Sequence, residues 1–492
     1  MKSIRITPFV KASALSALLL AGCSDRFLDK EPLGVLSSET FFQTEEHAVW
    51  ATNAVYEHLR SWEVHVFSYV GLTDIISDDA DKGSTPTDAN FLSEIDNFTF
   101  DPGNVAFSTV WTGYYRGIHR ANIAIERIPE IDMDPDLKAR LIGECKFLRG
   151  YFYFNLVRWF GDVPLITADL APDEYEQPRT PSSEVYAQII KDFEDASAAL
   201  PKKSGYSSED LGRATQGAAQ GMLARVYLSL GDYPKAASAA VDVIQSGEYS
   251  LYPSYADIFT RAGENSSESL FEVQATALET GGAGSQYNEV QGVRGVPNLG
   301  WGFNRPSDNL ITEYEFRDPR RDATILYVGE LLPDGSAFVE DNPDIFNERY
   351  NQKAWTPAVT GGNGNGAGNI RILRYADILL IAAEALSQTG EVSQALGYLN
   401  QVRFRARNGL TNILPDVTTT DPAQLRDKIW HERRVELAME QGRWFDLARQ
   451  GRAAAVLQGV GKTFVSGKHE LLPLPQSEID LSNDALIQNP GY

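Results

Sequence analysis

The chain reads GAAQGMLARVYLSLGDYPKAASAAVDVIQSGEYS from residue 217 to residue 250. Apolar side chains fall on one face of a helix at Leu223, Ala224 and Tyr227. A turn follows at Gly231-Asp232-Tyr233, and a second helical face carries Ala236, Ala240 and Val243. Small residues stand where the two helices have to approach closely, so this stretch predicts an antiparallel helix pair joined by a short turn.

The same pattern returns further along the chain. From about Ala376 to Arg407, residues Ala382, Ala383 and Leu386 precede a turn at Gly390, and Ala395, Leu399 and Val402 follow it at matching offsets. Both units have tetratricopeptide spacing. Residues 141–161 resemble a third first helix with a partner near 185–200, and an earlier pair is expected at 47–59 and 112–127. The sequence therefore predicts a mainly α fold of about four interrupted helix pairs.

The segments between and after the helix pairs differ in composition. Residues 251–370 are rich in Gly, Asn and aromatic residues and show no sustained helical period. Loops carried on a rigid helical frame are where binding usually occurs, so we expect the ligand there. A helix is predicted from about Pro422 to Gln450. The closing Leu472-Pro473-Leu474-Pro475 predicts an extended tail packed on the body.

The N-terminus has the features of a secretory lipoprotein signal. Lys2, Arg5 and Lys11 precede an apolar run, 12–20, that is too short to span a bilayer. The run ends in Leu20-Ala21-Gly22-Cys23, so we expect cleavage before Cys23 and lipidation of its thiol. An ordinary signal peptide with an incidental cysteine is the alternative. After cleavage and lipidation Cys145 would be the one remaining thiol, which leaves no internal disulfide.

Charge restricts the possible partners. The chain carries a formal charge of −23, and removal of residues 1–22 would take away three positive charges and leave −26. Such a surface repels phosphate backbones and anionic headgroups. Nucleic acid is therefore not expected as a partner, and membrane attachment has to be covalent or hydrophobic.

Several motifs resemble the SusD/RagB family of nutrient-uptake outer-membrane proteins. One is Asp377 to Ala385, DILLIAAEA, and a second is HERRVEL from His431, which continues through Arg443-Trp444-Phe445-Asp446-Leu447. The others are the tail from Leu472 to Gln488-Asn489-Pro490-Gly491-Tyr492, the start at Cys23, Phe27-Leu28-Asp29, and Phe147-Leu148-Arg149 through Trp159-Phe160-Gly161. They occur in the family's order along the whole chain.

The resemblance implies a surface-exposed, lipid-anchored outer-membrane protein that is not an enzyme and needs no cofactor. Family members bind oligosaccharides, or in some relatives peptides, and pair with a SusC-like TonB-dependent transporter. Four segments are expected: a signal peptide at 1–22, an N-terminal helical region at 23–250, a loop-rich insertion at 251–370, and a C-terminal region at 371–492.

Enzyme and metal motifs are incomplete. His431-Glu432 begins a zinc-protease helix, but Val435 replaces the second histidine, and no zinc site is expected. Asp74, Asp78, Asp79 and Asp81 could ligate Ca²⁺, but a solvated acidic loop or polar contacts to a sugar fit this cluster better. A surface glycoside hydrolase and a purely structural surface protein stay as alternatives.

The candidate ligand site combines two loops. Trp62, Asn90 and Phe91 lie in one, and Tyr287, Arg294 and Trp301 lie in the other. A flat aromatic ring covers the apolar face of a sugar, while Asn, Gln and Arg form hydrogen bonds with its hydroxyl rim. Asn288 and Gln291 in the second loop are therefore further candidates for contacts with a sugar. The family's starch-binding site is built from loops in comparable places, so the location rests on resemblance. Burial of Trp62 or Trp301 under its own loop is the alternative.

Overall fold

The computed structural model describes residues 41–345, 347–357 and 365–492. The predicted signal peptide and Cys23 lie outside these residues, as does the first half of the Gly-rich run 361–368. Of the described helices, none is long and apolar enough to cross a membrane.

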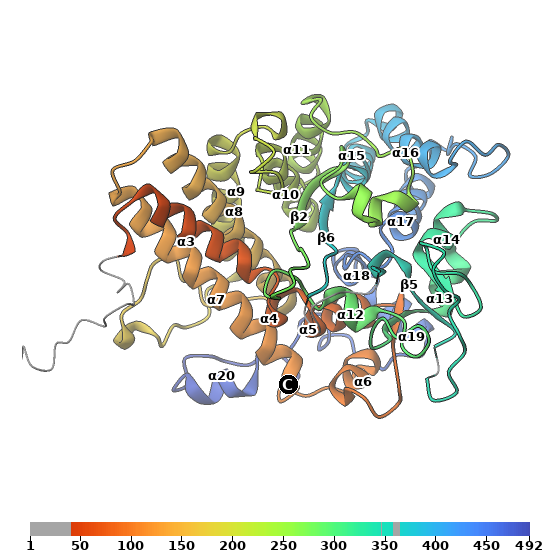
Figure 1. The fold of residues 1–492 in the computed structure, drawn as a ribbon, viewed down its shortest axis with the longest axis horizontal. Coiled ribbons are helices and arrows are strands. Elements are labelled where there is room, and N and C mark those ends of the chain that lie inside the picture. The colour runs from red at the N-terminus through yellow and green to blue at the C-terminus, as the bar shows by residue number, and fades with distance from the viewer. Residues whose placement is uncertain (1–40, 346, 358–364) are drawn as a thin grey trace, which may run out of the picture.

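Nine helices form the frame: α3 (Glu45–His58), α7 (Val105–Arg127), α8 (Pro135–Phe160), α9 (Ser182–Ala199), α10 (Gln216–Ser229), α11 (Tyr233–Gln245), α15 (Tyr375–Thr389), α16 (Val392–Ala406) and α17 (Pro422–Leu437). They pack in a continuous row, because α8 contacts α7 and α9, α10 contacts α9 and α11, and α15 contacts α11, α16 and α17 (Figure 1). The predicted helix pairs are confirmed. The contact of α11 with α15 also joins pairs that the sequence separates.

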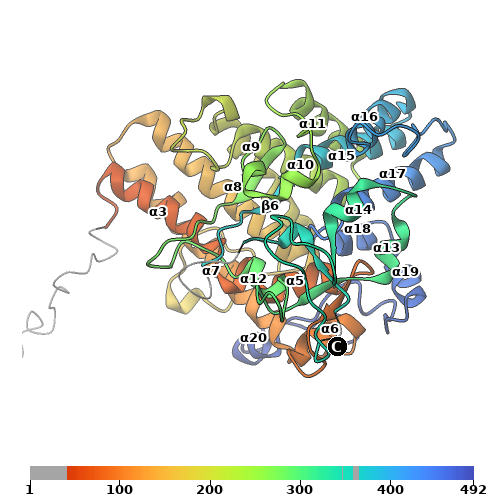
Figure 2. The same cartoon turned by 45° about the vertical axis from the view of Figure 1, so that its right-hand side comes forward.

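The smaller elements come from the segment between α3 and α7 and from the chain after α11. Three two-stranded antiparallel sheets pair β1 (Ala80–Gly83) with β3 (Phe303–Pro306), β2 (Ser269–Val273) with β6 (Ile370–Arg374), and β4 (Ile325–Tyr327) with β5 (Arg349–Asn351). The short helices are α4 (Trp62–His65), α5 (Phe67–Val70), the π-helix η2 (Gly71–Ile75), α6 (Asn90–Asn97), α12 (Tyr287–Gln291), α13 (Asp308–Glu313), α14 (Pro319–Thr324), α18 (Arg443–Arg449), α19 (Ala453–Gly459) and α20 (Gln476–Leu481). In Figure 2, α12, α13 and α14 lie below the row of α10, α15 and α16.

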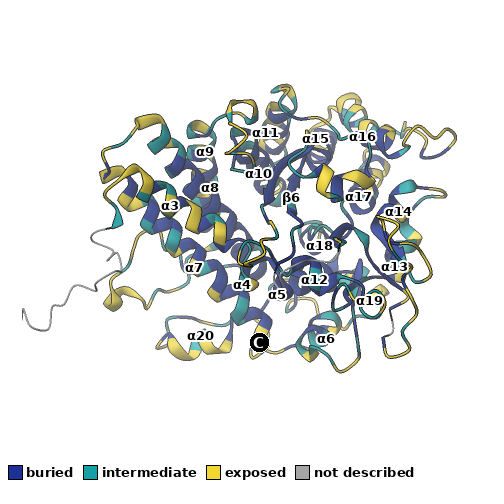
Figure 3. Ribbon diagram, in the orientation of Figure 1, coloured by how far each residue is buried: buried dark blue, intermediate teal, exposed yellow. Residues whose placement is uncertain are grey.

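The main core runs through the whole frame. It extends from Ala48 on α3 to Leu486 near the C-terminus, and α10 and α15 are buried along most of their length, whereas α20 is largely exposed (Figure 3). The tail is extended at Leu472 and Leu474, both fully buried, and the Leu472 amide donates to the carbonyl of Trp159 at 2.7 Å. The prediction of a packed, extended tail is confirmed.

The predicted continuous helix from Pro422 to Gln450 is wrong in its middle. α17 ends at Leu437 and α18 starts at Arg443, and between them Met439 and Gln441 have φ of +61° and +59°. This break places the Gln441 amide 3.0 Å from the carboxylate of Asp74. A tertiary hydrogen bond thus replaces helix continuity, which local periodicity does not reveal.

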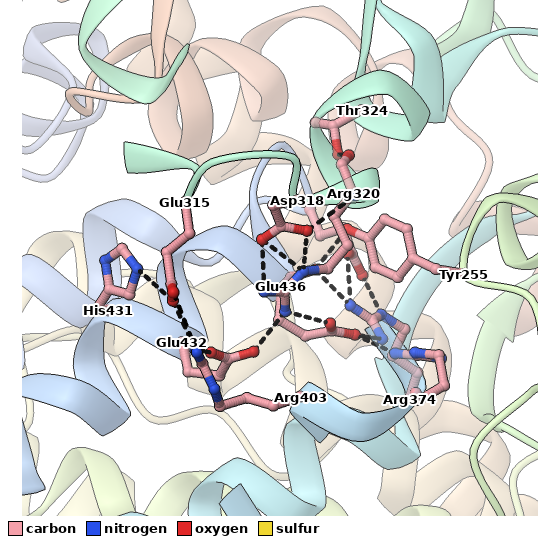
Figure 4. A network of polar contacts seen from close by, with 12 residues as sticks. Tyr255, Glu315, Asp318, Arg320, Thr324, Arg374, Arg403, His431, Glu432 and Glu436 are labelled. Carbon is pink, nitrogen blue, oxygen red and sulfur yellow. Dashed lines mark hydrogen bonds and ion pairs between the residues drawn. The ribbon is translucent and has the colours of Figure 1, made fainter. Parts of the chain in front are cut away.

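A buried ionic network attaches α14 to α17. Arg320 is fully buried and pairs with Asp318 at 2.8 Å, Glu432 at 2.6 Å and Glu436 at 3.0 Å (Figure 4). Glu436 also pairs with Arg374, at 2.7 Å, and with Arg405. Each buried charge therefore has at least one opposite charge beside it, which is the condition under which ions are tolerated in a protein interior.

Candidate functional site

The pairing of β1 with β3 brings the two candidate loops together. Gly83 lies opposite Phe303 in the sheet, and the amide of Ser84 donates to the carbonyl of Gly302 at 2.8 Å. The residues that follow β1 lead into α6, and those that precede β3 include Trp301. Two segments more than 200 residues apart in sequence thus meet at one place.

Backbone hydrogen bonds hold the second loop in shape. The amide of Trp301 donates to the carbonyl of Glu289 at 2.8 Å, and that of Gly302 donates to Gly292 at 3.0 Å. A Cβ on Gly300 would lie 2.2 Å from the Glu289 carbonyl oxygen, so no other residue fits there without a shift of the backbone. Gly302 has φ of +76°, where L side chains are strained. The two glycines therefore fix the position of Trp301.

Five aromatic rings gather at this junction, and we call them the aromatic cluster: Trp62, Phe67, Phe91, Trp301 and Phe303. Phe67 is the central ring, with centroids 5.4 Å from Trp62, 5.3 Å from Phe91, 5.9 Å from Trp301 and 4.7 Å from Phe303. Phe67 and Phe303 are buried, whereas Phe91 and Trp301 are half-buried and Trp62 is 38% exposed. Two buried rings thus support three that reach the surface.

The two indoles face each other at an angle. The ring centroids of Trp62 and Trp301 are 6.0 Å apart and their planes meet at 52°. Neither side chain is enclosed by its own loop alone, because each one packs against the other and against Phe67. Aromatic faces held by buried neighbours are preorganised to accept another flat, apolar surface.

Polar groups flank the cluster. Arg294 forms an ion pair with Asp88 and donates to the hydroxyl of Ser84 at 2.6 Å. The hydrogen bond from Arg294 holds the pKa of Asp88 below its usual range. Asn90 is exposed at the start of α6, next to Phe91. Arg294 and Asn90 therefore lie on the two segments that carry the exposed rings.

Three of the expected polar contacts lie in the interior instead. Tyr287 is 6% exposed and its hydroxyl accepts from the Gln441 amide at 2.6 Å. Asn288 is buried and donates to the Ala354 carbonyl at 2.8 Å, and Gln291 is fully buried and accepts from Asn304 at 2.7 Å. These side chains do not face solvent. They support the loop from beneath, because α12 turns that side inward.

Comparison with known proteins establishes the family. A model described as starch-binding associating with outer membrane matches residues 26–228, and a model described as SusD family matches residues 267–492. SusD-like protein P2 of Formosa agariphila is 32% identical, over 96% of this chain and 98% of its own. The chain belongs to the SusD family.

Solved SusD-like structures agree with the fold. A laminarin binding SusD-like protein superposes with a TM-score of 0.79 at 31% identity, covering 92% of this chain and 100% of that one. Surface glycan-binding protein A from Bacteroides thetaiotaomicron, in complex with laminarihexaose, has a TM-score of 0.77 at 27% identity, over 91% of this chain and 100% of its own. The tetratricopeptide-like helical fold is thereby confirmed.

In this SusD-family chain the acidic cluster is not a solvated loop, and that interpretation of the sequence is wrong. Asp78 pairs with Arg443 at 2.7 Å and with Arg434 at 2.9 Å, and Asp79 pairs with Arg434 at 2.8 Å. Asp81, near the surface, pairs with Arg305 at 2.6 Å. The arginines that neutralise the buried carboxylates come from the C-terminal helices, 355 residues or more away, so no local pattern predicts them.

Asp74 is the exception in the acidic cluster, because no cation among the described residues forms an ion pair with it. Its carboxylate accepts from Asn304 at 3.0 Å and from the backbone and side-chain amides of Gln441 at 3.0 and 3.1 Å. Burial raises the pKa of Asp74 to about 7, against the opposing effect of these hydrogen bonds. Through Asn304, which follows Phe303 in β3, this carboxyl group is linked to the floor of the aromatic cluster.

Other expected features lie elsewhere. Trp355 is half-buried against a small apolar group that contains Leu332 and Tyr350. His431 lies 3.2 Å from Glu313 on α13. In the part of the chain that the structure describes, no three His, Cys, Asp or Glu side chains gather as a metal site. Two surface grooves, of about 690 and 730 Å³, lie beside α20 and α16 and do not include the aromatic cluster.

Proposed function

We propose that this chain is a cell-surface lipoprotein that captures an oligo- or polysaccharide on the aromatic cluster and passes it to a SusC-like TonB-dependent transporter. The observation that carries the proposal is the pair of adjacent indoles, the exposed Trp62 and the half-buried Trp301, from segments that the fold brings together. Their faces suit the apolar face of a pyranose ring, and Asn90 and Arg294 offer hydrogen bonds to its hydroxyl rim.

Membership of the SusD family supports a glycan as the ligand, since one similar structure is a laminarin binding protein and another holds laminarihexaose. The negative charge of the chain favours a neutral glycan over a uronate. Peptide binding, as in other members, is the second candidate, and hydrolysis is the third. Laminarin is therefore the first polymer in the test, alongside other glycans and peptides.

The test compares tryptophan variants. We expect Trp301→Ala and Trp62→Ala each to weaken glycan binding by about 1–3 kcal/mol, or roughly 5- to 150-fold, measured by calorimetry. The matched control is Trp50→Ala, because Trp50 is 46% exposed but lies on α3, outside the aromatic cluster. The control should keep the affinity of the unaltered protein.

Stability separates a binding role from a packing role. Trp301 is half-buried against Phe67, so Trp301→Ala should also cost about 1–2 kcal/mol of unfolding free energy, less than the 3–5 of a core tryptophan. The more exposed Trp62 should cost less. Variants that fold and keep full affinity would refute the site. Shortening of the polymer on incubation would instead support a hydrolase.

The anchor and the partner require separate tests. Cys23→Ala should release the protein from the membrane fraction, and retention in the absence of the transporter would disprove lipid anchoring. Purification of tagged protein from native membranes in mild detergent should bring down a large β-barrel protein. Recovery of the chain alone would contradict the transporter complex.

A further inference from the structure

A second, smaller site lies inside the helical frame. A cavity of about 60 Å³ is lined by side chains of α8, α10, β6, α15, α17 and α18, and none of the five rings of the aromatic cluster borders it. A water molecule needs at least about 10–15 Å³ of such space, so there is room for roughly four waters or one ion as large as sulfate. A sugar does not fit. Six arginines line the cavity: Arg158, Arg225, Arg371, Arg374, Arg433 and Arg449.

The carboxylates around the cavity are shared between cations. Asp377 pairs with Arg225 at 2.6 Å and with Arg433 at 2.7 Å. Asp446 pairs with Arg433 at 3.2 Å and with Arg449 at 2.7 Å, and Arg449 has a further partner in Glu384 at 2.6 Å. Arg225, Arg433 and Arg449 are thus balanced by three carboxylates.

Another arginine of the cavity, Arg158, differs from these three in its partners. Its Nε donates to the Phe154 carbonyl at 3.1 Å and its Nη2 to the Asn155 side chain at 2.6 Å. The guanidinium lies 4.0 Å from the ring centroid of Phe154 and 3.5 Å from that of Phe445. Within the described residues no carboxylate forms an ion pair with it. Burial, with the nearby cation of Arg225, lowers the pKa of Arg158 to about 10, so it stays charged at neutral pH.

We propose that this cavity binds a small inorganic anion, of the size of chloride or sulfate, between Arg158 and Arg225. Arg158 is half-buried. A charge that is partly removed from water and has no counter-charge carries a desolvation cost, and one anion would supply the missing negative charge. Arg158 and Arg225 both line the cavity, and Nη1 of each has no acceptor among the described residues, so each has a donor left for the ion. The ion would tie α8 and α10 to the C-terminal helices.

The position of the anion can be observed directly in the unaltered protein. Crystals soaked in sodium bromide should show an anomalous scattering peak within hydrogen-bonding distance of the guanidinium groups of Arg158 and Arg225. Absence of a peak there, with bromide visible elsewhere on the protein, would overturn the proposal. In that case the two rings, the Phe154 carbonyl and the Asn155 side chain would stabilise the cation without an anion.

A sulfate titration of the melting temperature gives the second test. Sulfate stabilises proteins generally in a roughly linear way, whereas binding to the folded state adds a saturable rise. We expect that saturable rise in the unaltered protein and in the control Arg116→Met, whose arginine is 47% exposed. Arg158→Met should lose it.

The Arg158→Met variant also measures the cost of the half-buried, unpaired charge. Without sulfate, Arg158→Met should melt no lower than the unaltered protein, because the methionine keeps apolar contact with both rings and removes the unpaired cation. A saturable rise that persists in this variant would place the anion elsewhere and refute the assignment. If Arg158→Met does not fold, Arg225→Lys tests the same loss of a free Nη group.

Discussion

Arg320 offers the sharpest test of how the loop-rich part is attached to the frame. Its guanidinium is fully buried and is the one cation paired with Asp318 among the described residues, whereas Glu432 and Glu436 keep other arginines. Replacement by methionine, of similar length and without charge, strands Asp318 in the interior. The perturbation therefore isolates one buried carboxylate.

The expected magnitude follows from that burial. Removal of one partner of a buried ion pair costs about 3–5 kcal/mol, compared with about 0–1 for an exposed pair. The entropy of unfolding is about 2.1 cal/mol/K per residue, so a chain of 492 residues changes its melting temperature by about 1 °C for each kcal/mol. Arg320→Met should melt roughly 3–5 °C lower.

Calorimetry of Arg320→Met beside Arg116→Met measures the difference. Arg116 pairs with Glu63 at 3.2 Å on the surface, at 47% and 32% side-chain exposure, and its loss should shift the transition by less than about 1 °C. Equal shifts in the two variants would refute the reasoning, because they would show that the Arg320 network is solvated. A rise in melting temperature would show that desolvation outweighs the ion pairs.

Three further results are expected. Burial raises the pKa of Asp74 to about 7, above the unfolded value of about 3.9. The folded state therefore loses stability as pH rises from about 4 to 8. In urea unfolding, Asp74→Asn should flatten this fall of the unfolding free energy with pH. Glu436 is buried, but Arg405, Arg374 and Arg320 lower its pKa to about 2. The stabilisation that the ionised Glu436 gives the folded state is therefore complete above about pH 4.3 and is lost as pH falls toward 2. Glu436→Gln should remove this acid-sensitive part of the unfolding free energy, and an unchanged pH profile would contradict the assignment. Gly300→Ala should displace Trp301 and weaken glycan binding. The control Gly397→Ala should leave the affinity unchanged, because an added Cβ there has no atom within 4 Å. Equal affinities in the two variants would show that the loop around Gly300 adapts to the added methyl group.

The frame could be predicted because helix packing leaves a local record. Ala382 and Ala383 are fully buried where α15 packs against α11, and the 3.6-residue period marks such positions directly. α8 starts at Pro135, six residues before the start at Leu141 that its apolar pattern predicts. Asp134 caps that helix by accepting from the Leu137 amide at 2.8 Å, and Pro135 follows as its first residue. That capping signal is present in the sequence.

The candidate site was predictable only in part, for a different reason. Trp301 and Trp62 could be selected by their polar, glycine-rich or aperiodic surroundings, but the same surroundings selected Tyr287, which is buried. Composition reports which side chains a loop has, not which way the loop turns. Phe67, the ring that holds the cluster together, looks in sequence like any residue of an apolar run.

The charges explain why neither half of the chain can build this site alone. Asp78 and Asp79 on the N-terminal segment are neutralised by Arg434 and Arg443, and Asp74 is bonded by Gln441 in the break between α17 and α18. Without those C-terminal groups, three buried carboxylates would lie directly before β1, Asp78 and Asp79 with no partner and Asp74 with Asn304 alone, at a cost that would expose the segment to water. β1 is the strand that positions β3, and with it Trp301. Formation of the aromatic cluster therefore depends on the docking of the C-terminal helices, although none of their side chains belongs to the cluster.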